Sequence, residues 1–199
     1  MIIIGDVHGK VNKYLNIIEN EESSIQLGDF GFKKEYDLLK HEIDKNPSKF
    51  DNHKICFGNH DYYPYLNESF SLGDFSFYPH HSLMSIRGAY SIDKHSRIEG
   101  KSWFSNEELD YPTFQKLIDN IEDFKPNIIV SHECPSFLCN KLFNLENNTR
   151  TSKNFDFIFN HIHKPKFWIF GHHHKSIRER IFCCNFIGLS ELEIFKLSS

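Results

Sequence analysis

Five short stretches of the sequence end in residue types that bind metal ions. Each is an apolar run that stops at glycine or serine and continues with Asp, Asn or His. Such runs are typical of buried strands, and ligands of an open parallel sheet bind beyond the carboxyl ends of its strands. One rim of a sheet is therefore predicted to gather seven metal ligands: Asp6, His8, Asp29, Asn59, His132, His172 and His174.

The expected donor atoms are imidazole nitrogens and carboxylate or amide oxygens. This set suits divalent ions, of which manganese is preferred here and Fe, Zn, Co and Ni are the alternatives. Two such ions about 3.5–4 Å apart hold both sides of a phosphoryl group and generate hydroxide between them. Gly5 and Gly9 permit a tight loop that brings Asp6 and His8 to one ion. The carboxylate of Asp29 is the expected bridge between the two ions.

Two residues beside the ligands are expected to act in catalysis. His60 follows the ligand Asn59 and is predicted to donate a proton to the leaving oxygen. Asp61 is predicted to orient the ring of His60. His173 lies between two ligands on an extended segment, where neighbouring side chains point to opposite sides. We therefore expect His173 to be exposed or to lie behind the ligands.

Composition and charge narrow the class of protein. The chain of 199 residues is 39% hydrophobic and 25% charged, which predicts a single globular domain over residues 1–199. The net charge of −4 gives no global basic field, so nucleic acid is expected only as a substrate. No apolar stretch approaches the roughly 20 residues that span a bilayer, and the start lacks a signal peptide. We expect a cytoplasmic protein without membrane contact, and its oligomeric state is left open.

The sequence has five cysteines, at Cys56, Cys134, Cys139, Cys183 and Cys184. Their number is odd and no Cys-x-x-Cys pair occurs. Neither a disulfide framework nor a zinc site of the cysteine type is therefore predicted. The expectation is a set of buried or half-buried thiols.

The predicted elements mix strand-helix units with hairpins. Strands are expected at residues 1–4, 24–27, 54–57, 75–77, 84–86, 127–130, 166–170, 180–187 and 191–197. Helical faces are expected at residues 11–18, 35–44, 114–121 and 155–162, the third of these in a helix that Asp110 caps. Residues 138–149 are expected to form an exposed loop over the site. This pattern indicates an α/β fold in which sheet packs on sheet with helices outside.

The motifs GDVHG, GD, GNHD, SH and GHHH, in this order, resemble those of the calcineurin-like metallophosphoesterases over about the whole chain. The segment from Arg87 to Leu109 is also similar to small metallophosphoesterases of phages and prophages. The resemblance implies a four-layer αββα sandwich of two mixed β-sheets flanked by helices. It implies His60 as the catalytic histidine outside the ligand set. The implied ligands are Asp6, His8, Asp29 and His174 for the first ion, and Asp29, Asn59, His132 and His172 for the second.

The sequence departs from this family's serine/threonine protein phosphatases at the arginines that clamp a phosphate monoester. Those enzymes carry a further Asp-Arg-Gly at the second motif and an Arg before the glycine of the third motif. Here the second motif continues as Phe-Gly-Phe, and Phe57 precedes Gly58. Arg87, or else Arg97, is the predicted replacement from another loop. The alternative interpretation is an ordinary surface or salt-bridged arginine.

The predicted function is a metal-dependent phosphoesterase in which a metal-bridging hydroxide attacks phosphorus. Because the protein-phosphatase arginines are missing, a phosphodiester or nucleotide-type substrate is favoured slightly. One alternative is a phosphomonoesterase that acts on a phosphoprotein or a small phosphate. Another is a non-catalytic scaffold that keeps the fold, which the complete ligand set and His60 disfavour.

Overall fold

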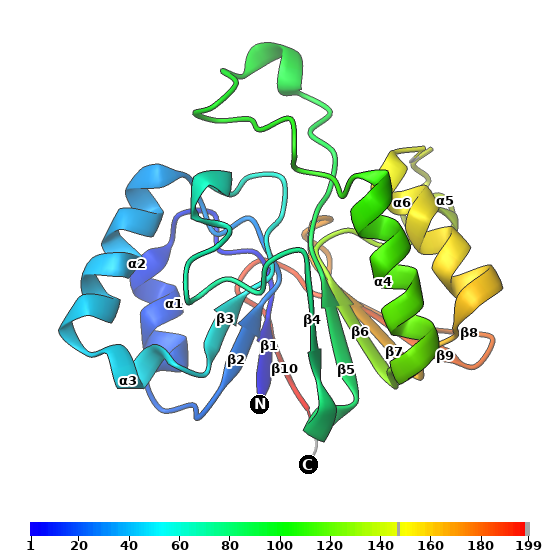
Figure 1. Cartoon of the computed structure of the whole chain (residues 1–199), viewed down its shortest axis with the longest axis horizontal. Helices are drawn as coiled ribbons and strands as arrows, with labels where there is room; N and C mark the ends of the chain where they lie inside the picture. Colours follow the sequence, from blue (N-terminus) through cyan, green and yellow to red (C-terminus); the bar gives the residue numbers. More distant parts are fainter. Residues whose placement is uncertain (147, 198–199) are drawn as a thin grey trace.

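Two β-sheets lie face to face in the computed structural model, with helices on both outer sides (Figure 1). The structure describes residues 1–146 and 148–197. The predicted α/β fold, a four-layer sandwich of two mixed sheets flanked by helices, is confirmed.

The first half of the molecule comprises β1 (Ile2–Ile4), α1 (Val11–Ile18), β2 (Ser24–Gln26), α2 (Lys33–Lys45), α3 (Pro47–Phe50), β3 (His53–Ile55) and, from the end of the chain, β10 (Ile194–Lys196). Its sheet has the strand order β10-β1-β2-β3. Strands β1 to β3 are parallel, and β10 pairs antiparallel with β1. The three helices cover the outer face of this sheet (Figure 1).

The second half comprises β4 (Phe75–Tyr78), β5 (Leu83–Ile86), α4 (Tyr111–Phe124), β6 (Ile128–Ser131), α5 (Ser136–Phe143), α6 (Arg150–Phe157), β7 (Phe167–Phe170), β8 (Ile177–Ile181) and β9 (Cys184–Gly188). Its sheet has the order β4-β5-β6-β7-β9-β8, with β4 and β8 antiparallel at the two edges. Strands β5, β6, β7 and β9 are parallel. Asp110 caps α4 as predicted, since its carboxylate accepts the Thr113 N–H at 2.9 Å.

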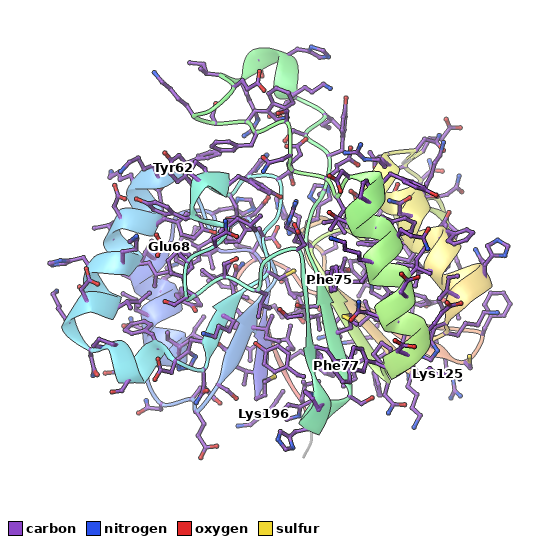
Figure 2. The ribbon with its side chains drawn as sticks, in the orientation of Figure 1. Tyr62, Glu68, Phe75, Phe77, Lys125 and Lys196 are labelled. Atoms are coloured by element: carbon purple, nitrogen blue, oxygen red, sulfur yellow. The ribbon has the colours of Figure 1, made fainter. Side chains whose placement is uncertain are left out.

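Side chains along the strands alternate between separate apolar cores. On β1, Ile2 and Ile4 pack under α1 and α2, whereas Ile3 packs into the core between the two sheets. On β4, Phe77 points to the side of α4 (Figure 2), where its ring stacks on Phe124 with 4.3 Å between centroids. A shift of one residue would turn every such side chain to the wrong core. The strand ends that carry the predicted ligands are therefore held in fixed register.

Three predicted segments differ from the structure. The strand predicted at residues 191–197 is limited to β10, because the chain turns at Leu192 with a φ of 56°. Residues 180–187, predicted as one strand, belong to the hairpin of β8 and β9, which turns at Phe182 with a φ of 53°. No glycine or asparagine marks that turn in the sequence. Residues 138–149 were predicted as an exposed loop but begin in α5, because Leu138 and Cys139 are buried against the second sheet. Position 147 of that stretch lies outside the described residues.

The segment between β5 and α4 extends beyond the strand ends, at the top of Figure 1. It contains a short 3-10 helix at Lys94–Ser96 and a turn closed by the hydrogen bond from Gly100 N–H to Trp103 O. Among the described residues, no helix has both the length and the apolar character needed to cross a bilayer.

Candidate metal centre

The seven predicted ligands all lie in loops that follow the carboxyl ends of β1, β2, β3, β6 and β7. Backbone hydrogen bonds tie these loops together. The N–H groups of Val7 and His8 both donate to the carbonyl of Asp29, at 3.2 and 2.8 Å. Across the two sheets, the His132 side chain bonds the Leu27 carbonyl through Nδ1 at 2.5 Å. Loops from both sheets therefore form one rim.

Four of the predicted ligands form a first cluster. Asp6, His8, Asp29 and His174 each place one donor atom within 4.8 Å of the others. The Nε2 atoms of His8 and His174 face each other at 2.8 Å. Oδ2 of Asp6 lies 3.0 Å from His174 Nε2 and 3.5 Å from His8 Nε2. The structure thus brings together the residues predicted for the first ion.

A second cluster shares Asp29 with the first. Asp29, His132 and His172 place their donor atoms within the same 4.8 Å limit. Nε2 of His132 lies 3.2 Å from Asp29 Oδ1, 3.1 Å from His172 Nδ1 and 3.3 Å from Asn59 Oδ1. All seven predicted residues therefore converge, and Asp29 is the member common to both clusters, as expected for a bridging carboxylate.

The donor atoms of both clusters fit divalent cations. The Nε2 atoms of His8 and His174 are 2.8 Å apart, so only one proton can lie between them. Two imidazole nitrogens that face each other in this way can both bind one cation. Oδ2 of Asp6 is buried and accepts no hydrogen bond of good geometry. An orphaned buried carboxylate oxygen is costly unless a cation is bound to it. The set of nitrogen and oxygen donors matches Mn²⁺, Zn²⁺ or Fe²⁺.

The charges at the rim also favour bound cations. Burial raises the pKa of Asp6, but the adjacent imidazoles of His174 and His8 outweigh burial and lower this pKa to about 2. Burial lowers the pKa of His132, but the carboxylates of Asp29 and Asp6 outweigh it and raise this pKa to about 10. Two buried carboxylates thus create a field that draws positive charge into the site.

The backbone at the rim is strained in a way that places the ligands. His8, Asp29, His172 and His174 all have a positive φ, between 46° and 64°. Non-glycine residues rarely adopt this left-handed region, and such strain concentrates at functional sites. Gly58 allows the two sheets' loops to approach, because a Cβ there would lie 2.6 Å from both Asp29 Oδ1 and His132 Nε2.

His60 lies beside the clusters but belongs to neither. Its Nδ1 lies 3.2 Å from Asp29 Oδ2, and its side chain is 28% exposed. The prediction that Asp61 orients this ring is not what the structure shows. The buried carboxylate of Asp61 instead accepts the N–H groups of Asp29, Phe30 and Gly58 at 2.9, 2.7 and 2.6 Å. Asp61 therefore fixes the backbone of the ligand loops, a role that the sequence did not reveal.

The structure places Arg87 and Arg97 differently. The guanidinium of Arg87, predicted to face the substrate, is buried against Asp74 and the carbonyls of Asn106 and Glu107. Arg97, from the projecting segment, lies 2.5 Å from His60 Nε2 through its NH2 group. Two bonds of 2.7 Å join its guanidinium to Asp93. Of the two arginines, Arg97 is the one at the rim.

Glu133 is a functional candidate that sequence reasoning missed. Its buried Oε2 lies 3.6 Å from Nε2 of His172, while Nδ1 of His172 faces His132. A carboxylate on the far nitrogen of a ligating histidine fixes the ring and raises its basicity. The only sequence signal was position, since Glu133 directly follows His132.

Cavities border the rim on two sides. The larger, of about 790 Å³, is lined by His172, His173, Tyr90 and Ile92 among others. The smaller, of about 220 Å³, is lined by His8, His60, Phe32 and neighbouring residues. His80 and His81 line a cavity with Met1 and Lys54 at the opposite ends of the strands, so they lie far from the ligand rim.

Comparisons with known proteins identify the family. No curated protein matches the chain. A solved structure from Staphylococcus aureus, described as a putative 5′-nucleotidase in complex with α-ketoglutarate, is 15% identical with a TM-score of 0.55, and the match covers 97% of this chain and 49% of that one. The sulfate thiohydrolase SoxB of Thermus thermophilus, with glycerol, is 14% identical with a TM-score of 0.45, over 93% of this chain and 30% of that one. The chain spans about half the length of the first and less of the second.

A family model described as calcineurin-like phosphoesterase matches residues 1–176. The chain belongs to the calcineurin-like phosphoesterase family.

Proposed function

We propose that this protein hydrolyses a phosphodiester or a nucleotide-type phosphoester with two divalent cations, manganese preferred, at the rim. One observation supports the proposal above all others: Asp29 is common to two clusters of facing donor atoms. Asp6, His8, Asp29 and His174 would hold one cation, and Asp29, Asn59, His132 and His172 the other. When bound, two such cations activate water for attack on phosphorus and offset the charge of the phosphoryl oxygens.

His60 and Arg97 act on different oxygens of the substrate in this proposal. Nδ1 of His60 donates its proton to Asp29 Oδ2 at 3.2 Å, which leaves Nε2 to accept from Arg97. A phosphate oxygen competes with Nε2 for the Arg97 guanidinium, since charge-assisted bonds to phosphate are stronger than bonds to a neutral ring. Nε2 of His60 is then free to take up a proton and give it to the leaving oxygen.

The size of the larger cavity favours a nucleotide over a small inorganic ester. Pockets for ligands of nucleotide size usually enclose about 300–1,000 Å³. The cavity of about 790 Å³ beside His172 falls in this range, and half-buried Tyr90 lines it. An aromatic ring of this kind offers a face on which a base can stack. The 5′-nucleotidase among the structural neighbours has the same fold, which fits this substrate class but does not test it.

Two chromogenic esters test the proposal. With Mn²⁺ supplied, turnover of bis-p-nitrophenyl phosphate is expected to exceed that of p-nitrophenyl phosphate. A strong preference for the monoester would overturn the diester assignment and favour the second candidate, a phosphomonoesterase. The missing protein-phosphatase arginines and the burial of Arg87 argue against that candidate.

A non-catalytic scaffold is the remaining alternative. A scaffold has no use for strained backbone at its ligand positions, because such strain serves to position functional groups. His8, Asp29, His172 and His174 nevertheless all have a positive φ. Wild-type protein that binds no manganese in elemental analysis and turns over neither ester would favour the scaffold.

A further inference from the structure

A second group of metal-binding side chains lies behind the rim, outside the ligand set already described. Glu133, Cys134, Cys139 and His173 each offer one donor atom, and these atoms lie within 4.8 Å of one another. Glu133 and Cys134 follow β6, Cys139 lies on α5, and His173 follows β7. Three elements that are separate in sequence therefore place two sulfurs, one nitrogen and one oxygen around a single point.

The separations between these donor atoms match the edges of a tetrahedron around zinc. Zn–S bonds of about 2.3 Å and Zn–N or Zn–O bonds of about 2.0–2.1 Å give edges of about 3.8 Å for S–S, 3.5 Å for mixed pairs and 3.3 Å for N–O. The two sulfurs lie 3.3 Å apart, and His173 Nε2 lies 3.4 and 3.5 Å from them. Oε1 of Glu133 lies 2.9 Å from His173 Nε2 and 4.0 Å from Cys139 Sγ. Each value is within about 0.5 Å of its edge.

The surroundings suit a structural ion. Cys134 and Cys139 are fully buried, Glu133 is 1% exposed, and the ring of Phe143 stacks on His173 at 4.2 Å between centroids. Glu133 and His173 also line the larger cavity, which gives an ion a path from solvent. The sulfurs are too far apart for a disulfide bond of about 2.05 Å. A thiolate pair with one imidazole and one carboxylate is a donor set for Zn²⁺ rather than for Mn²⁺.

We propose that Glu133, Cys134, Cys139 and His173 bind one structural Zn²⁺, distinct from the cations of the rim. Such an ion joins the loop after β6 to the loop after β7. Those two loops carry His132 and His172, the ligands predicted for the second rim cation. Glu133 lies between the two sites, because its other oxygen lies 3.6 Å from His172 Nε2. The zinc ion would therefore hold His132 and His172 at a fixed separation.

Cobalt titration of the reduced, metal-free full-length protein tests the proposal. Cobalt bound by thiolate gives a near-ultraviolet charge-transfer band, which nitrogen and oxygen ligands at the rim do not give. We expect a band that saturates at one thiolate-bound cobalt per chain and disappears when Zn²⁺ is added. Cys134→Ser and Cys139→Ser should each weaken the band by more than half. The control Cys183→Ser changes an exposed thiol outside the group and should leave the band unchanged.

A measurement on the wild type alone covers the case in which those variants do not fold. With one zinc per chain and Mn²⁺ in excess, zinc X-ray absorption should show two sulfur and two nitrogen or oxygen neighbours. A zinc shell without sulfur would overturn the proposal. The absence of a cobalt band in folded wild-type protein, or a band that is lost only in Cys183→Ser, would also overturn it. Purified protein that contains a disulfide between Cys134 and Cys139 and no zinc would do the same.

Discussion

Gly58→Ala is the substitution whose effect follows most directly from the geometry of the rim. A Cβ at this position would lie 2.6 Å from Asp29 Oδ1, His132 Cδ2 and His132 Nε2. Ordinary van der Waals contacts begin near 3.4 Å. The side chains of Asp29 and His132 must therefore each move by about 0.8 Å from the new Cβ. The φ of Gly58 lies outside the left-handed region, so alanine adds no backbone strain there. The cost therefore falls on the ligands themselves.

The expected loss follows from the size of this displacement. A misplacement of about 1 Å in a catalytic group costs about 100-fold in rate, or about 2.7 kcal/mol of transition-state stabilisation. Disturbed ligand positioning also weakens metal binding by about 10–100-fold. With bis-p-nitrophenyl phosphate, we expect kcat/KM of Gly58→Ala to fall about 100-fold at fixed Mn²⁺. The Mn²⁺ concentration for half activation should rise about 10–100-fold.

Gly73→Ala is the matched control. Apart from its two chain neighbours, no described residue has an atom within 4 Å of a Cβ at Gly73, but its φ is +64°. Alanine there adds about 1–2 kcal/mol of backbone strain and contacts no ligand. The melting temperature of Gly73→Ala should therefore fall, while its activation by Mn²⁺ should stay that of the wild type. A folded Gly58→Ala enzyme whose rate and Mn²⁺ midpoint stay within twofold of the wild type would show that Asp29 and His132 are not displaced.

Four further substitutions separate the roles of the residues around the rim. His60→Ala is expected to lower kcat by about 10²–10⁴-fold with the manganese content unchanged, and elemental analysis with steady-state rates checks both. Arg97→Ala should lower kcat/KM by about 10–100-fold, the worth of a charge-assisted bond to phosphate; a normal value would remove Arg97 from substrate binding. Arg87→Ala should instead destabilise the fold by about 2 kcal/mol, and thereby lower the melting temperature by about 4–8 °C. Its KM should stay unchanged, and a raised KM at normal stability would contradict the structural role. Asp61→Asn should weaken Mn²⁺ activation by about 10–100-fold, because an amide cannot accept the three backbone N–H groups that the carboxylate holds; an unchanged midpoint would argue against this.

The strand ends and the ligand convergence were predictable from the sequence. Each strand is a short apolar run that stops at glycine or serine, and parallel strands deliver their following loops to one edge. The residue types at those ends then indicate a metal site. Chance alone does not place Asp, Asn or His directly after five such strands. Asp29 was identifiable as the residue common to both clusters because a carboxylate has two oxygens to offer.

The partners of the flanking residues were not predictable. Asp61 follows His60 in the chain, but its carboxylate turns toward backbone N–H groups that only the folded loops present. Arg87 and Arg97 have the same chemistry, and burial beside Asp74 separates their roles. His173 was expected to be exposed or to lie behind the ligands, but its partners come from the loop after β6 and from α5, far away in the sequence. Long-range packing of this kind leaves no periodic signal.

A crystal structure of the protein grown with Mn²⁺ tests the shared use of Asp29 most directly. The anomalous difference map should show two peaks about 3.5–4 Å apart. Either one oxygen of the Asp29 carboxylate should bind both ions, or each of its two oxygens should bind one ion. A single peak at the rim, or two peaks that both lack Asp29 as a ligand, would contradict the dinuclear assignment.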